Sequence, residues 1–81
     1  MEFTEKELEA LITYAEQIKV LVPQITYSEE LIKDLFKSMK DKTEVIKENL
    51  EHIGNNFLVL SLIGFDYDRK LENKVFKYLE W

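Results

Sequence analysis

Residues 55–65 read NNFLVLSLIGF and form the most apolar run in an otherwise heavily charged chain. A short apolar run does not reveal its own period, so these residues alone fit either a strand or a buried helix. The rest of the chain favours a helix, because it offers no second strand and an isolated strand would leave its backbone groups without hydrogen bonds. In a helix, the apolar side chains of this run point to every side, and every side then needs cover.

The composition around this run predicts one small all-α domain over residues 1–81. Apolar residues make up 46% of the chain and charged residues 33%, which is typical of a folded protein rather than a disordered one. Two glycines and one proline among many strong helix formers favour helices throughout. We therefore expect a bundle of three or four helices, antiparallel where the connectors are short.

The first two helices are predicted from their end signals. Thr4 followed by Glu7 has the pattern of a capping box, so the first helix should begin there. Pro23 cannot continue a helix and disfavours helical geometry before it, so this helix should end near Leu21. Ser28 precedes two glutamates, which is the pattern of a helix cap followed by acidic residues at the positive helix end. We expect the second helix to start at Ser28.

The stretch from the second helix to the apolar run can be interpreted in two ways. Its apolar residues step by four and three from 32 to 60, so the periodicity permits one helix over residues 28–63. Two segments predict interruptions: residues 41–43 offer caps and a polar residue, and the Gly-Asn-Asn of 54–56 is a common way to end a helix. We expect a break or kink in each segment.

The last helix is expected to follow Gly64, which should end the apolar segment, and to run to Trp81. Asp66 or Asp68 would then cap the new helix. The apolar residues expected on its inner face are Leu71, Val75, Tyr78 and Leu79.

No group of residues in the chain predicts catalysis, a cofactor or a metal. His52 is the only histidine, and with Glu48 it falls short of the three or four ligands that a metal site needs. Residues 66–74 begin like a calcium loop, but Lys70 and Leu71 occupy positions that need a ligand and a glycine. Phosphate-binding glycine loops and nucleophile motifs are missing. We therefore expect no catalytic, cofactor-binding or metal site, and no enzyme activity.

The charge distribution predicts an acidic surface on the first helix. The net charge is −5, which disfavours direct nucleic-acid binding because such proteins collect positive charge on one face. The candidate acidic residues are Glu2, Glu5, Glu9 and Glu16. They would attract a basic protein or, as an alternative function, mimic DNA phosphates and block a nucleic-acid-processing protein, as an inhibitor of phage or mobile-element origin could. A cytoplasmic location is expected, because no secretion signal or membrane-spanning run is present and cysteine is lacking.

The C-terminal third of the chain predicts a surface for another protein. Residues 57–81 hold six of the ten aromatic residues, the type that dominates interface energetics. The predicted interface residues are Phe57, Leu58, Leu60, Ile63, Phe65, Phe76 and Trp81. We expect a small interaction or regulatory protein that self-associates, most simply as a two-fold homodimer. In the alternative, a tight bundle encloses all of these side chains within one chain.

Overall fold

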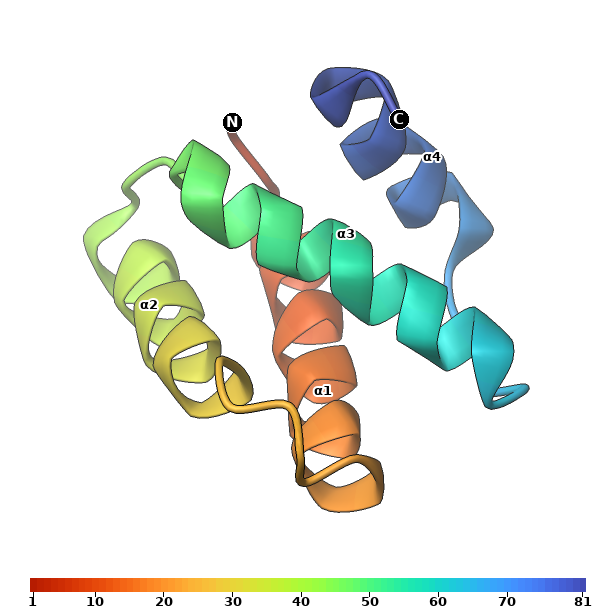
Figure 1. Cartoon of the computed structure of the whole chain (residues 1–81). Helices are drawn as coiled ribbons and strands as arrows, with labels where there is room; N and C mark the ends of the chain where they lie inside the picture. Colours follow the sequence, from red (N-terminus) through yellow and green to blue (C-terminus); the bar gives the residue numbers. More distant parts are fainter.

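Four α-helices form the computed structural model, which describes residues 1–81 (Figure 1). They are α1 (Glu5–Leu21), α2 (Ser28–Asp41), α3 (Lys47–Leu62) and α4 (Arg69–Leu79). The structure has no strand, so the all-α prediction is confirmed, and the apolar run lies mainly in a helix. None of the four helices combines the length and the apolar composition that a bilayer crossing requires.

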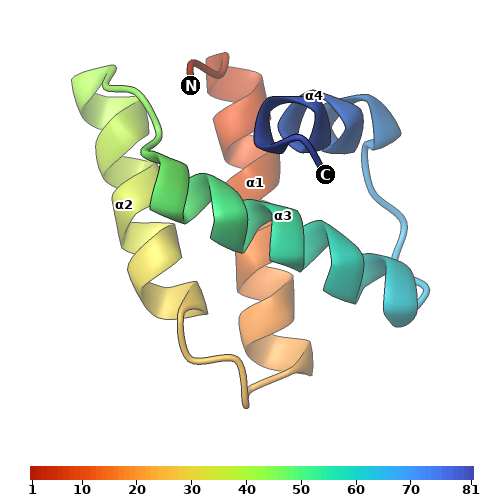
Figure 2. The same cartoon turned by 45° about the horizontal axis from the view of Figure 1, so that its top comes forward.

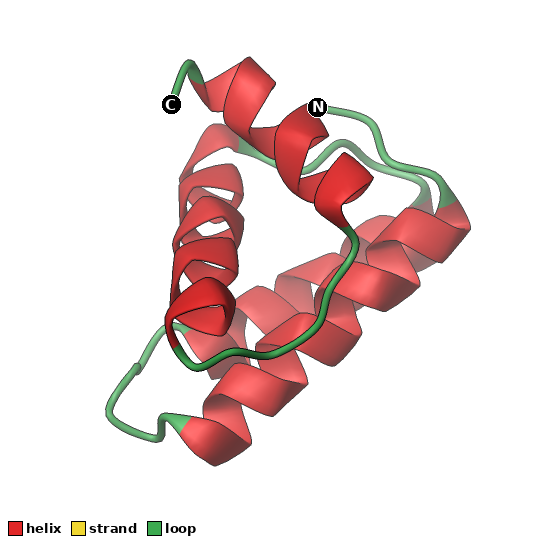
Figure 3. Cartoon of the chain, turned by 90° about the vertical axis from the view of Figure 1, so that its right-hand side faces the viewer, coloured by secondary structure: helices red, strands yellow, loops and turns green.

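The helices α1 and α2 lie side by side and antiparallel, joined by the short connector 22–27 (Figures 1 and 2). The helix α3 runs across this pair rather than along it (Figures 1 and 2), and Figure 3 shows that helices and loops alone make up the fold. The helix α4 packs on α3 and reaches the N-terminal end of α1, where Lys74 Nζ lies 2.9 Å from Glu7 Oε1. The predicted small bundle is therefore present, with one helix crossing two antiparallel ones.

One hydrophobic core joins all four helices. It contains Leu8, Leu11, Ile12, Ala15, Ile18, Leu31, Leu35, Val45, Leu50, Ile53, Phe57, Leu60, Tyr67, Leu71 and Val75. Every helix supplies at least two of these side chains, and the connectors before α3 and α4 supply Val45 and Tyr67. Because the burial of apolar surface is the main favourable term in folding, this cluster fixes how the helices pack.

The predicted ends of α1 and the predicted start of α4 are confirmed by their hydrogen bonds, whereas α4 ends at Leu79 and not at Trp81 as predicted. The Thr4 amide donates to Glu7 Oε1 at 2.8 Å, and the Glu7 amide donates to Thr4 Oγ1 at 3.2 Å, which completes the capping box. The helix α1 then ends at Leu21, two residues before Pro23. At the start of α4, Asp68 is the N-cap, and its side chain accepts hydrogen bonds from the backbone amides of Lys70 and Leu71.

The two predicted interruptions have different outcomes. The helix α2 ends at Asp41, and Lys42 takes the left-handed conformation with φ 54°, so the break near 41–43 is confirmed. The break near 54–56 is wrong, because α3 continues through these residues to Leu62. Gly54 is buried inside the helix, and Gly64, with φ 74°, is the glycine that follows the helix end.

The predicted start of the second helix at Ser28 is confirmed, but the predicted role of Ser28 as its cap is wrong. Ser28 is the first residue of α2, and Tyr27 before it is the N-cap, without a side-chain hydrogen bond. Tyr27 already has near-helical angles (φ −79°, ψ −13°), so the chain turns into the helix before a capping Ser28 would be in place. The Ser28 hydroxyl is instead buried without a hydrogen-bond partner.

Candidate protein-interaction surface

The helix α3 has a buried face and an opposite face that is partly apolar. Leu50, Ile53, Phe57 and Leu60 point into the core. Leu58 and Leu62 lie on the other side and are 46% and 86% exposed. Because residues four apart are neighbours on a helix, these two leucines stack along one outward face.

The C-terminal residue Trp81 extends this apolar face over the middle of α3. A Cβ at Gly54 would lie 2.5 Å from Trp81 Cζ3 and 2.9 Å from Leu79 Cδ1, so only glycine leaves room for these side chains. The Trp81 ring also lies 5.8 Å from the Phe76 ring, between centroids, and the Trp81 amide donates to the Phe76 carbonyl at 3.0 Å. Figure 2 shows the C-terminus beside the centre of α3.

Trp81 remains 53% exposed in this position. Ile63, which follows α3, is 44% exposed. Together with the two leucines these residues form the outer apolar surface, defined here as Leu58, Leu62, Ile63 and Trp81. Large exposed apolar patches mark interaction sites more often than isolated apolar side chains do.

The predicted interface residues are divided between core and surface. Phe57 and Leu60 are 1% and 0% exposed, so the prediction that they meet a partner is corrected: the chain itself buries them. Phe65 and Phe76 are half-buried against the core. The structure leaves the side chains of Leu58, Ile63 and Trp81 exposed.

Two exposed apolar residues differ from the sequence interpretation. Leu62 was not among the predicted interface residues, although its spacing of four from Leu58 was a usable signal once a helix is assumed. Tyr78 was expected on the inner face of the last helix and is 53% exposed instead. By its spacing Tyr78 shares the face of Leu71 and Val75, but it lies in the last turn of α4, where the buried residues of the helix no longer continue.

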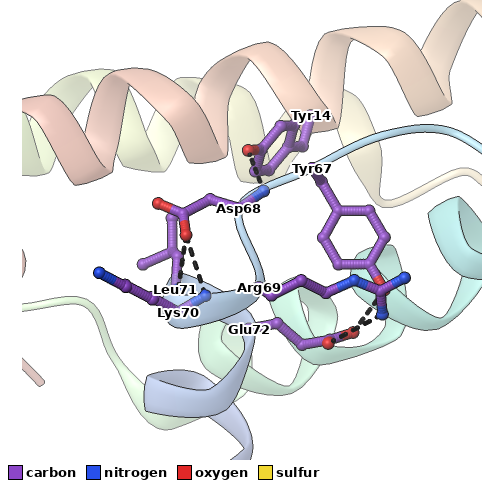
Figure 4. Close-up of polar contacts among 7 residues, drawn as sticks. All are labelled: Tyr14, Tyr67, Asp68, Arg69, Lys70, Leu71 and Glu72. Carbon is purple, nitrogen blue, oxygen red and sulfur yellow. Dashed lines mark hydrogen bonds and ion pairs between the residues drawn. The ribbon is translucent and has the colours of Figure 1, made fainter.

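A cluster of hydrogen-bonded polar side chains holds the connector between α3 and α4 in place (Figure 4). The Tyr67 hydroxyl donates to Glu72 Oε2 at 2.7 Å and accepts from Arg69 Nη1 at 2.9 Å. Burial, and then the bond to Glu72, raise the pKa of Tyr67 above its ordinary value. The Asp68 amide donates to the Tyr14 hydroxyl at 2.8 Å, which ties the connector to α1. The polar groups of this cluster are hydrogen-bonded to one another, and these bonds orient α4.

The predicted acidic residues lie on the surface of the N-terminal region. Glu2, Glu5, Glu9 and Glu16 are all exposed, and none of them forms an ion pair. Glu7 behaves differently, because it binds Lys74 across the gap between α1 and α4. Partial burial acts to raise the pKa of Glu7, but the hydrogen bonds from the Thr4 amide and from Lys74 outweigh it, so this pKa is lowered.

His52 packs against an aromatic ring, and the surface carries a hollow near the start of α1. The His52 ring stacks on Tyr27, with ring centroids 4.2 Å apart, and the Tyr27 hydroxyl donates to Asn56 Oδ1 at 2.7 Å. No group of three or more histidine, aspartate or glutamate side chains is placed to hold a metal ion. A hollow of about 290 Å³ between the start of α1 and the end of α2 is lined by Glu2, Phe3, Glu5, Leu8, Ser38, Met39, Lys42 and Thr43.

Comparison with known proteins assigns the chain to no family. No protein-family model matches it, and neither the curated proteins nor the solved structures contain a significant match. The exposed apolar and acidic side chains are therefore the basis for assigning a function.

Proposed function

We propose that the chain is a non-enzymatic, cytoplasmic protein-interaction module that self-associates through the outer apolar surface. The observation that carries this proposal is the exposure of Leu58 and Leu62, side by side on α3 and 46% and 86% exposed. Removing apolar surface from water is favourable by roughly 25 cal/mol per Å². A second molecule can cover these leucines, which the four helices of one chain leave uncovered.

The state of the polar side chains supports a binding role over a catalytic one. The buried tyrosine and glutamate of the α4 connector are engaged with each other and with Arg69. His52 is stacked on Tyr27 rather than placed beside a nucleophile. A catalytic site needs a base and a reacting group that are free to meet a substrate, and these pairings serve packing instead.

Sedimentation velocity over a concentration series from about 10 μM to about 1 mM tests self-association, since interfaces of modest area bind in this range. The informative variant is Leu62→Gln, and the matched control is Val20→Gln. Both residues lie in the last turn of a helix and are highly exposed, at 86% and 75%, so the two changes perturb their own helices similarly.

We expect the wild type and Val20→Gln to sediment faster as concentration rises, while Leu62→Gln stays monomeric. The wild type should also associate in high salt, because apolar contacts are not screened. A wild type that remains monomeric at the highest concentration, or a Leu62→Gln variant that associates equally well, contradicts the proposal.

A second candidate function, inhibition of a nucleic-acid-processing protein, is favoured by the four exposed glutamates without ion pairs, Glu2, Glu5, Glu9 and Glu16. Binding of this kind should weaken steeply with ionic strength. Changing all four residues to glutamine would abolish such inhibition but leave self-association through α3 intact. The two functions are therefore separable in one pair of measurements.

A further inference from the structure

We propose that the hollow between the start of α1 and the end of α2 binds a free amino acid whose side chain is apolar along its length and ends in a hydroxyl, as in tyrosine. The hollow has a volume of about 290 Å³, close to the lower end of the range for small-molecule sites, which is about 300 Å³. It shares no residue with the outer apolar surface, so this inference does not depend on the proposed self-association.

Two features of the backbone build the hollow. On one side, Lys42 takes the left-handed conformation after α2, and the amides of Lys42 and Thr43 both donate to the Ser38 carbonyl. This turn folds the start of the connector back onto the last turn of α2. On the other side, the Val45 amide donates to the Met1 carbonyl at 3.1 Å, which holds the segment before α1 against the connector between α2 and α3.

Ser38 contributes a hydroxyl that the fold leaves without a partner. Ser38 lines the hollow and is only 8% exposed, and its hydroxyl makes no hydrogen bond to another group of the chain. Thr13 behaves differently, because its hydroxyl donates to the Glu9 carbonyl four residues earlier at 3.0 Å. A polar group that is nearly buried and unpaired costs free energy, so a ligand that offers Ser38 a hydrogen bond removes this cost.

The other lining residues match the remaining parts of an amino acid. Three buried or half-buried apolar side chains provide the contact for a ring: Phe3, Leu8 and Met39. Glu2, Glu5 and Lys42 line the same hollow, are exposed and form no ion pair. Charges of both signs therefore stand unpaired at the rim. An α-ammonium group would lie beside the two glutamates and an α-carboxylate beside Lys42, as charge-assisted hydrogen bonds favour.

A second hollow of about 310 Å³ adjoins the first and shares Ser38 and Thr43 with it. Its only apolar lining residue is Ile46, and its polar side chains are already partly engaged, because Asn49 Nδ2 donates to Asp34 Oδ2 at 3.1 Å. Since small-molecule sites are mainly apolar with a few converging polar groups, the first hollow is the better fit for the ligand.

NMR titrations of the full chain, observed on its backbone amides, test each contact with matched probes. L-Tyrosine carries all three polar groups, whereas L-phenylalanine lacks the hydroxyl, tyramine lacks the carboxylate and N-acetyl-L-tyrosine lacks the ammonium group. We expect L-tyrosine to shift the amides that line the hollow with a Kd of about 1 mM, since exposed charge pairs contribute little. L-Phenylalanine should bind about fivefold more weakly, and the other two probes about threefold more weakly.

Two variants assign these preferences to residues. In Ser38→Ala the preference for L-tyrosine over L-phenylalanine should disappear, and in Lys42→Gln the preference for L-tyrosine over tyramine should disappear. Lys33→Gln is the control, because Lys33 is exposed on α2 and lines neither hollow, and it should keep both preferences. Each comparison is made within one variant, so a change in stability does not alter it. An L-tyrosine titration that shifts no amide of the hollow, or a Ser38→Ala variant that still prefers L-tyrosine, overturns the proposal.

Discussion

At the residue scale, Ser28 carries a hydroxyl that the fold does not use. The group is buried without a hydrogen-bond partner, and such a group costs about 1–3 kcal/mol. We expect Ser28→Ala to leave stability unchanged or to raise it by up to about 1 kcal/mol, because alanine removes the unpaired oxygen. Urea unfolding measures the change.

The matched control for this prediction is Thr4→Ala, which removes a hydroxyl that does cap a helix. Loss of a cap costs about 1 kcal/mol. A Ser28→Ala variant destabilised as much as Thr4→Ala would show that Ser28 acts as a cap, contrary to the structure.

Gly54 is the second residue whose role depends on a distant partner. Alanine in the middle of a helix normally makes a protein more stable than glycine does, by about 1 kcal/mol. At position 54, however, the alanine Cβ would collide with Trp81 and Leu79. We expect Gly54→Ala to displace the Trp81 ring into water and to gain less stability than the helix preference alone gives. Trp81 is the only tryptophan, so a red shift of its fluorescence reports the displacement.

The control for Gly54→Ala is Asn55→Ala, because Asn55 is exposed on the same helix. It should increase stability through helix preference and leave the emission spectrum unchanged. Identical spectra for Gly54→Ala and the wild type would argue against the close contact between Gly54 and Trp81.

These residues show which local features a sequence predicts. The caps at Thr4 and Asp68 were predicted correctly because the groups that they bind lie within three residues along the chain. The role of Gly54 depends on Trp81, a residue far along the sequence, so the Gly-Asn-Asn segment was interpreted as a helix end. Local hydrogen bonds are visible in a sequence, and a close approach of two elements is not.

At the scale of elements, the ion pair between Glu7 and Lys74 joins α1 to α4. The folded pKa of Glu7 is lowered, so the ionised carboxylate stabilises the fold at neutral pH. This contribution is present above the ordinary value of 4.5 and is lost as pH falls through the folded pKa. We expect Glu7→Gln to lower stability by about 0.5–1 kcal/mol at pH 7, since both side chains are partly exposed.

The difference in the free energy of unfolding between Glu7→Gln and the wild type should shrink as the pH is lowered below 4.5, because the wild-type carboxyl then becomes neutral as well. Chemical denaturation at a series of pH values measures it. Glu9→Gln is the control for the loss of one glutamate charge on α1, since Glu9 is exposed and forms no ion pair. A constant difference at all pH values would mean that the charge of Glu7 is not the cause.

The helix α3 explains why the apolar run could be assigned to a helix but not divided into core and surface. The composition of residues 57–63 gives no period, since six of these seven residues are apolar. The division depends on where α1 lies: Tyr14 and Phe57 meet edge to face with ring centroids 5.8 Å apart, which fixes the buried side. Leu58, the next residue, is thereby turned outward.

At the scale of the whole molecule, one chain encloses a core of 15 apolar residues and still leaves the outer apolar surface in water. The helix content and most helix ends were predictable, because capping, proline and period are local properties. The crossing of α3 over the α1 and α2 pair was not, because it arises from how four apolar faces fit together. The premise that one chain cannot cover the whole apolar run is true for Leu58 and Leu62 and wrong for Phe57 and Leu60.

The core residues of α3 and the exposed Leu58 and Leu62 lie on opposite sides of the helix. The residues that keep the chain folded are therefore different from those available for binding. Substitutions at Leu58 or Leu62 leave the interior untouched, so they can alter the strength or choice of binding without unfolding the chain. A lineage of such proteins could therefore exchange one companion for another by changing a few positions on a single helix, while the architecture beneath stays the same.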